Sequence, residues 1–276
     1  MKLSVVIPSY KGQALLEHSL PHLCKALDKI ASSEIIVVDN GSKDSTITFL
    51  KHHYPDVRVK ELAKNYGFTK AVNAGIKMSK GEFILILNND CHVGKNTIQT
   101  LIGFMAKNND IVATQPVVQR PDGSVENIGY VVDLKKGRVA PVTDKRLLPS
   151  FDNKTMWETG LVYGLSGACL LLQKDIFRKV GHFDEAFHSY LEDVDFFIRL
   201  ASYGYEYAPC LDTIVVHKHM STSAGMKGYK EWHDLTNWMR IITKNYPRPF
   251  ILSHSVNLGI ERMRNANGWL KRMIQV

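Results

Sequence analysis

Apolar runs of strand length alternate with segments of helical periodicity through the first third of the chain. The apolar runs cover residues 3–7, 34–39, 57–61 and 83–87. The segments between them repeat apolar residues every three or four positions, over residues 15–30, 44–54 and 67–78. Continuous apolar runs are typical of strands buried on both faces. The alternation therefore predicts a doubly wound, mixed but mostly parallel central sheet flanked by helices.

The pattern is less regular in the rest of the chain. Strands are predicted over residues 111–115, 164–173, 206–209 and 213–217. Helices are predicted over residues 96–107, about 175–180, 191–203, 227–245 and 250–273. Residues 133–159 show little periodicity, and so long a loop in a compact domain is usually functional or mobile. We expect one α/β domain over residues 1–225, followed by a helical appendage over residues 226–276.

Charge and cysteine content narrow the class of protein. The net charge of +8 favours anionic partners such as nucleotide diphosphates or anionic lipid headgroups. Basic clusters interleaved with aromatic residues are absent from the sequence, so we expect no nucleic-acid partner. The four cysteines form no CxxC pair, which suits a reducing cytosol. The first apolar run is too short for a signal peptide, and no run reaches the roughly 18 apolar residues of a membrane span. These features predict a cytoplasmic protein.

Three polar clusters follow early strands. They are Pro8-Ser9-Tyr10, Asp39-Asn40-Gly41-Ser42 and Asn88-Asn89-Asp90. The carboxyl ends of parallel strands share one edge of a sheet, where open α/β sheets bind their ligands. Asp39 could accept N–H groups of a nucleobase, and Asp90 is a hard oxygen donor that suits Mg²⁺ or Mn²⁺ beside a diphosphate. The alternative for Asp90 is an ordinary Asn/Asp turn. Neither GxGxxG nor GxxxxGK[ST] occurs, so the sequence favours a nucleotide bound through a metal.

Two later clusters carry further titratable groups. Glu192-Asp193-Val194-Asp195 opens a predicted helix, and an acidic helix start is also what the helix dipole favours. His217-Lys218-His219 follows a predicted strand. A neutral imidazole there could complete a metal shell begun by Asp90, and the alternative is a structural or solvated histidine.

Together these motifs resemble the family-2 glycosyltransferases with a GT-A fold, most closely the rhamnosyltransferase-like branch. The resemblance runs from residue 3 to about residue 246. Its motifs are Val5–Tyr10, Val37–Ser42, Asn65-Tyr66-Gly67 together with Ala71–Gly75, Leu87–Asp90, Ser166-Gly167-Ala168, Glu192–Asp195 and His217. Seven motifs in the family's order carry the resemblance; none does so alone.

The resemblance implies roles for these residues around the nucleotide. It implies a nucleotide-binding half over residues 1–120, with contacts from Pro8, Ser9, Tyr10, Asp39, Asn40, Gly67, Asn73, Asn88 and Asn89. Asp39 would contact the base, most often uracil or thymine. Residues 88–90 occupy the DXD position, with Asn88 in place of the first Asp, and Asp90 would hold the divalent metal, Mn²⁺ or Mg²⁺. His217 would be a second metal ligand, with His219 as the alternative.

The acceptor half, residues 121–225, would carry the chemistry. The resemblance implies that Asp193 is the general base with Glu192 beside it, and that Ser166, Gly167 and Ala168 line the acceptor side. The implied reaction is inverting transfer from a UDP- or dTDP-sugar, rhamnose-like or hexose, to a hydroxyl of a glycan or lipid-linked acceptor in cell-envelope polysaccharide synthesis. The alternatives are a non-catalytic sugar-nucleotide or glycan-binding protein and a nucleotidyltransferase. The latter normally needs a glycine- and basic-rich loop, where this chain has only Tyr10-Lys11-Gly12.

Two segments remain open to more than one interpretation. Residues 133–159 could contact the acceptor or close over the donor, or could form a surface insertion. The tail from residue 250 mixes basic and apolar positions, as in helices that lie on an anionic membrane. It could equally pack on its own domain or on a second subunit of a homodimer. The membrane alternative would place the protein at the inner face of the membrane.

Overall fold

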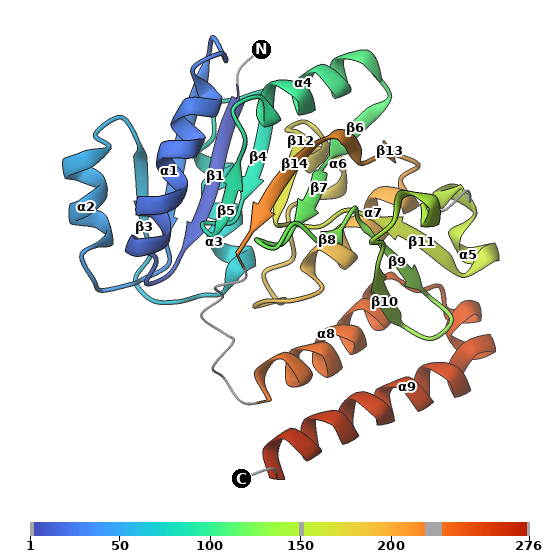
Figure 1. Ribbon diagram of the computed structural model, residues 1–276. Helices are drawn as coiled ribbons and strands as arrows, with labels where there is room; N and C mark the ends of the chain where they lie inside the picture. The colour runs from blue at the N-terminus through green and yellow to red at the C-terminus, as the bar shows by residue number, and fades with distance from the viewer. Residues whose placement is uncertain (1–2, 149–151, 219–227, 275–276) are drawn as a thin grey trace.

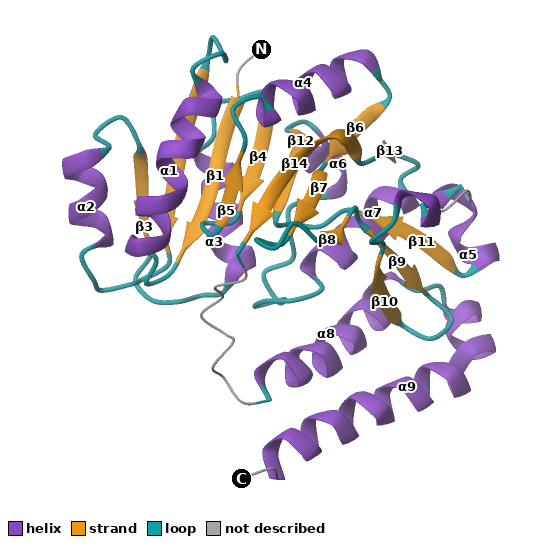
Figure 2. Cartoon of the chain, viewed as in Figure 1, coloured by secondary structure: helices purple, strands orange, loops and turns teal. Residues whose placement is uncertain are grey.

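The computed structural model describes residues 3–148, 152–218 and 228–274, and its centre is a seven-stranded sheet (Figures 1 and 2). The strands run in the order β13 (Glu206–Tyr207), β6 (Ile111–Thr114), β12 (Cys169–Gln173), β4 (Phe83–Leu87), β1 (Leu3–Ser9), β2 (Ser33–Asp39) and β3 (Arg58–Glu61). β4, β1, β2 and β3 are parallel, and β12 is antiparallel to both of its neighbours. The predicted mixed, mostly parallel sheet is confirmed.

Helices cover both faces of this sheet. Those of the first half are α1 (Gln13–Leu27), α2 (Thr46–His53), α3 (Phe68–Met78) and α4 (Thr97–Lys107). Val5 and Ile7 of β1 share a hydrophobic cluster with α1 and α4, whereas Val6 shares another with α3. Gly75 of α3 lies so close to β1 that a Cβ there would be 2.3 Å from Val6 Cγ1. Burial on both faces explains why this strand is apolar at successive positions.

Two smaller sheets are attached to the second half. One contains β5 (Cys91–Val93), β14 (Cys210–His217), β7 (Pro116–Gln119) and β8 (Val125–Asn127). The other contains β10 (Arg138–Pro141), β9 (Tyr130–Asp133) and β11 (Leu161–Gly164). The sheet that contains β14 brings two predicted metal ligands together. β14 runs antiparallel to β5 and pairs His217 with Cys91, the residue after Asp90.

Two sequence predictions in this region are wrong. Residues 133–159 are not one irregular loop. They contain β10, the 3₁₀ turns Lys145–Leu147 and Asn153–Thr155, and α5 (Met156–Thr159). The predicted strand 164–173 is two strands, β11 and β12, separated by the turn at Leu165–Ala168. All four residues of β10 are exposed, so this strand lacks the apolar signal that reveals a buried one. A lid role for residues 133–159 stays a prediction.

The helix α7 (Glu192–Ser202), which follows the short helix α6 (Ile176–Val180), contacts the first of the two last helices. α8 (Tyr229–Asn245) contributes Trp238 and Ile241 to the hydrophobic cluster that includes β4 and β12. α9 (Arg248–Ile274) runs back along α8, as Figure 1 shows. Within the described ranges, no helix combines the length and the apolar character needed to cross a membrane.

Asp195 fixes α8 to α7. Its carboxylate is fully buried, and it lies 2.9 Å from Arg199 Nη2 and 3.1 Å from Lys244 Nζ. Asn245 Nδ2 donates to its other oxygen at 2.9 Å. A buried carboxylate is tolerated here because two cations and an amide compensate its lost hydration.

We predict that Asp195→Asn lowers the free energy of unfolding by about 3 kcal/mol, because it leaves the largely buried Arg199 without its anion and leaves Lys244 with Asp184 alone. Urea denaturation measures this. Asp175→Asn is the matched control, since Asp175 and its partner Arg178 are both more than four-fifths exposed. Equal stability of the two variants would contradict a role for Asp195 in joining the helices.

Candidate active site

The three predicted polar clusters meet at the carboxyl edge of the central sheet. Ser9 at the end of β1 pairs in register with Asp39 at the end of β2. The Asn40 N–H donates to the Ser9 carbonyl at 2.8 Å. From the other side, Asn89 Nδ2 donates to Ser9 Oγ at 3.1 Å. Pro8 lies within β1, opposite Val38.

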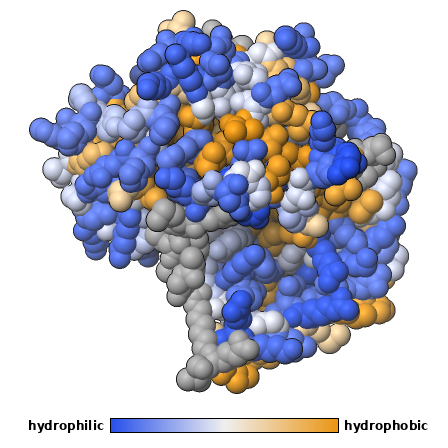
Figure 3. Space-filling model, viewed as in Figure 1, coloured by the Kyte–Doolittle hydropathy of each residue, from blue (hydrophilic) through white to orange (hydrophobic). Residues whose placement is uncertain are grey.

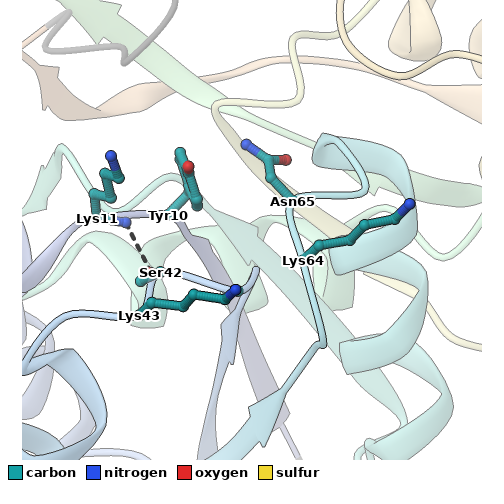
Figure 4. Close-up of a pocket in the computed structure, with 7 residues that line it drawn as sticks. Tyr10, Lys11, Ser42, Lys43, Lys64 and Asn65 are labelled. Atoms are coloured by element: carbon teal, nitrogen blue, oxygen red, sulfur yellow. Dashed lines mark hydrogen bonds between the residues drawn. The ribbon is translucent and has the colours of Figure 1, made fainter.

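A pocket of about 420 Å³ opens at this edge (Figure 4). It is lined by Tyr10, Lys11, Gly41, Ser42, Lys43, Lys64 and Asn65. Its three lysines make it attractive to an anion. Tyr10 was predicted for the nucleotide site, whereas the lysines were not, because isolated surface lysines give no sequence signal.

Asp39 is buried beside this pocket. Its Oδ2 accepts from the Ser42 N–H at 3.1 Å, and its Oδ1 accepts from the Ser42 hydroxyl. The adjacent Gly41 has a φ of +75°, and a Cβ there would lie 2.4 Å from the Cα of Lys64. Glycine is therefore required for the loops after β2 and β3 to meet around the pocket.

Three other residues predicted for the nucleotide site join loops. The Asn40 amide group donates to the Gly67 carbonyl and to Asn65 Oδ1, both at 3.0 Å. Gly67 has a φ of +89°, and a Cβ there would be 2.2 Å from the His188 carbonyl oxygen. Asn73 is buried in α3 and donates to the Phe183 carbonyl at 2.7 Å. A nucleotide contact by Asn40, Gly67 or Asn73 stays a prediction.

A carboxylate–imidazole cluster forms where β5 meets β14. Asp90 Oδ1 lies 3.2 Å from His217 Nε2, and both side chains are buried. At the other end of the imidazole ring, His217 Nδ1 lies 3.2 Å from Glu126 Oε2. Burial alone would lower the pKa of His217, but its hydrogen bonds to these two carboxylates outweigh that effect and raise it to about 9. His219 lies outside the described residues.

This cluster fits a divalent metal. Ligand atoms of Asp90, Cys91 and His217 lie within 4.8 Å of one another. Burial raises the pKa of the Cys91 thiol well above its usual value, which disfavours the thiolate form that binds metals. A carboxylate and an imidazole remain, a donor set suited to Mn²⁺. Asn88 Oδ1, at the DXD position, is buried and has no hydrogen-bond partner in the described part of the chain.

Glu126 was not identified by sequence reasoning. It belongs to the three-residue strand β8, in a stretch without clear periodicity or a recognised motif. A carboxylate that holds the second nitrogen of a metal-binding histidine fixes the orientation of the ring. Its contact with His217 Nδ1 leaves Nε2 directed at Asp90.

The acidic pair lies at the start of α7. Asp193 Oδ2 accepts from the Gly167 N–H at 3.2 Å, and Oδ1 accepts from the Val194 N–H at 2.8 Å. Burial raises the pKa of both acids, and the Asp193 charge raises that of Glu192 further. Glu192 Oε2 is buried and has no hydrogen-bond partner within the described ranges.

The turn at residues 166–168 contacts both Asn88, at the DXD position, and Asp193 of the acidic pair. The Asn88 N–H donates to the Ala168 carbonyl at 2.9 Å, while Gly167 binds Asp193. The Ser166 N–H donates to Gln115 Oε1 at 2.6 Å, which ties the turn to the end of β6. The sequence-predicted acceptor residues thus lie between the DXD position and the predicted base.

The mixed, mostly parallel sheet flanked by helices is the architecture of the GT-A glycosyltransferases, as predicted. The family profile described as glycosyl transferase family 2 matches residues 4–181. The chain belongs to this family.

Relatives and solved structures agree with this assignment. The chain is 30% identical over 245 residues to the N-acetylglucosaminyl-diphospho-decaprenol L-rhamnosyltransferase of Mycobacterium tuberculosis, covering 80% of this chain and 77% of that protein. It resembles S. aureus TarS 1–349 in complex with UDP-GlcNAc, with a TM-score of 0.64, 18% identity and coverage of 94% and 70%. The mannosyltransferase PcManGT of Pyrobaculum calidifontis, in complex with GDP-Man and Mn²⁺, has a TM-score of 0.65, 16% identity and coverage of 98% and 74%. The two structural likenesses show the fold.

We predict that Glu126→Gln weakens Mn²⁺ binding about 10- to 100-fold, because the neutral amide orients and polarises His217 less well than a carboxylate. Isothermal titration of the purified protein with Mn²⁺ measures the effect without any turnover. Glu158→Gln, an exposed position on α5, is the control. Unchanged affinity in the Glu126 variant would show that the ring is oriented without this carboxylate.

Proposed function

We propose that the protein transfers a sugar from a uridine or thymidine diphosphate donor to a hydroxyl group of a lipid-linked or glycan acceptor in cell-envelope polysaccharide synthesis. The M. tuberculosis relative is by its name a rhamnosyltransferase that acts on a lipid-linked N-acetylglucosamine, and the TarS neighbour binds UDP-GlcNAc. The observation that carries the proposal is the turn at residues 166–168. This turn contacts both the DXD position and Asp193.

The lysine-lined pocket would bind the nucleotide, with Tyr10 and Asp39 on the base side. Asp90 and His217 would hold the divalent metal, with Glu126 orienting the histidine. When bound, the metal would neutralise charge on the departing diphosphate. Because Asn88 replaces the first acid of the DXD motif, one anionic group fewer faces the cation.

Asp193 would accept the proton of the attacking hydroxyl. Its carboxylate is held by two backbone N–H groups, and burial raises its pKa to about 6, which makes it a stronger base than an exposed aspartate. Burial and the adjacent charge raise the pKa of Glu192 further, which keeps it protonated while Asp193 is ionised. Attack by the activated hydroxyl opposite the diphosphate would invert the anomeric configuration.

Successive segments of the chain would have different roles. Residues 1–120 would bind the nucleotide, residues 121–225 would bind the acceptor, and residues 226–276 would form a helical appendage. Activation of a hydroxyl by a buried acidic pair has no use in a protein that only binds sugar nucleotides. The loop after β1 offers only Lys11 and Gly12 as the basic and glycine residues that a nucleotidyltransferase would need.

We predict that Asp193→Asn lowers sugar transfer about 10²- to 10⁴-fold, since the amide cannot accept the proton, while donor affinity changes little. Radiolabelled-sugar transfer gives the rate, and titration with the nucleotide diphosphate gives the affinity. Asp110→Asn, an exposed acid elsewhere on the surface, is the control. Parallel losses of binding and turnover would instead assign Asp193 to the donor site or to folding.

The wild-type rate should also depend on pH. Asp193 must be ionised to act as a base, and burial raises its pKa to about 6. Transfer should therefore decline as the pH falls through about 6, well above the range in which an ordinary aspartate titrates. A pH profile of kcat/KM measured with the donor saturating tests this. A profile that stays flat down to pH 4.5, roughly the ordinary carboxyl range, would contradict the assignment.

A further inference from the structure

The outward face of α9 carries a continuous apolar stripe. Its members are between 39% and 76% exposed and follow one another at intervals of three, four or seven positions, which keeps them on one face of the helix: Leu252, Val256, Ile260, Met263, Leu270 and Ile274. Phe250, Leu258 and Glu261 are buried on the opposite face, against the body of the protein. Figure 3 shows some hydrophobic residues among hydrophilic ones at the lower margin, where Figure 1 places α9. No other described element covers this stripe, because its side chains are exposed in the folded chain.

Positive charge borders the stripe. Helical spacing places Arg248 on one side of it and Arg264 and Lys271 on the other, and all three are exposed. The only carboxylate of α9 is Glu261, which is 5% exposed and paired with Arg138 and Arg264. The exposed face of the helix therefore combines apolar and cationic groups with no anion of its own.

An aromatic pair stands at the end of this surface. Trp232 of α8 is 46% exposed, and its ring centroid lies 5.3 Å from that of Trp269 in α9. Tryptophan, with an apolar body and a polar N–H, is enriched where hydrocarbon meets water. The pair lies where α9 meets α8, and the exposed Trp232 adds an aromatic ring beside α9.

We propose that this face of α9, with the Trp232–Trp269 pair, binds the surface of an anionic phospholipid bilayer. An amphipathic helix of this kind lies in the interface, with its apolar side in the headgroup–acyl boundary and its cations on anionic headgroups. Figure 1 shows α8 and α9 on the side of the molecule toward which β1 and β14 run, the side of the candidate active site. The inference rests on the proposed function only for its purpose, which is to bring the enzyme to a lipid-linked acceptor.

A second copy of the chain is the competing occupant. Val256, Ile260, Met263, Leu270 and Ile274 follow heptad spacing, as in a two-helix seam. Charge argues against it, because a partner α9 would bring further cations and no exposed carboxylate to pair with Arg264 and Lys271. Anionic headgroups supply the charge that a second copy lacks.

The test is co-sedimentation of the full chain with vesicles of phosphatidylcholine alone or mixed with phosphatidylglycerol. We expect binding only to the anionic vesicles, and weaker binding at high salt. Met263→Glu combined with Leu270→Glu should reduce partitioning at least about tenfold, because both residues lie in the stripe and are exposed enough to be replaced without unfolding. Leu147→Glu, at a position that is 66% exposed and lies outside α9, is the matched control and should bind as the wild type does.

Light scattering after size-exclusion chromatography distinguishes a bilayer from a second copy of the chain as the partner of this face. A monomer that binds anionic vesicles supports the proposal. A dimer that the double substitution converts to monomer, without vesicle binding by the wild type, would overturn it in favour of a second copy. Undiminished vesicle binding by the double variant would also overturn it. None of these measurements requires a sugar donor, so failure of the proposed transfer activity would be seen separately.

Discussion

The antiparallel insertion of β12 beside β4 is the constraint on which the candidate site depends. β12 starts where β4 ends, with Cys169 paired with Leu87. The turn before it, residues 166–168, therefore lies at the carboxyl edge of the sheet beside Asn88. A parallel strand in this position would start at the opposite edge and carry the turn away from the nucleotide pocket. One hydrogen bond from Gly167 then brings Asp193 to the same place.

The Asp90–His217 pair, the proposed metal site, depends on a second strand pairing, that of β14 with β5. This antiparallel pair places His217 beside the residue that follows Asp90, and β8 brings Glu126 to the far side of the imidazole ring. The buried Asp90 carboxylate and the partly buried Glu126 carboxylate would lie uncompensated beside a neutral imidazole, which is why the pKa of His217 is raised. A divalent cation would provide the same compensation, so the arrangement is electrostatically suited to exchanging a proton for a metal.

The sequence revealed those parts of the fold and site whose signals are local. Buried parallel strands such as β1 and β4 are apolar at successive positions, and the polar residues at their ends mark the edge that carries the candidate site. Glu126 and the pocket lysines were not predicted, because strand pairing and loop contacts between distant parts of the sequence bring them to the candidate site. β10 was not predicted, because all of its residues face solvent. The turn within residues 164–173 was not predicted either, because its first and last residues, Leu165 and Ala168, are apolar. The sequence marks Gly67 and Gly41 only as members of motifs. The structure gives the reason for each glycine: the backbone of His188 comes close to Gly67, and the backbone of Lys64 comes close to Gly41.

The central claim is that one edge of the sheet binds a nucleotide diphosphate sugar through a metal and transfers the sugar. The most direct measurement is a panel of uridine, thymidine and guanosine diphosphate sugars, each with Mn²⁺, Mg²⁺ or EDTA, read as thermal shift and as slow hydrolysis of the donor. We expect a uridine or thymidine donor to stabilise the protein and to be hydrolysed slowly, and we expect both effects to be lost in EDTA. Indifference to every donor, or a response only to nucleoside triphosphates with release of pyrophosphate, would contradict it.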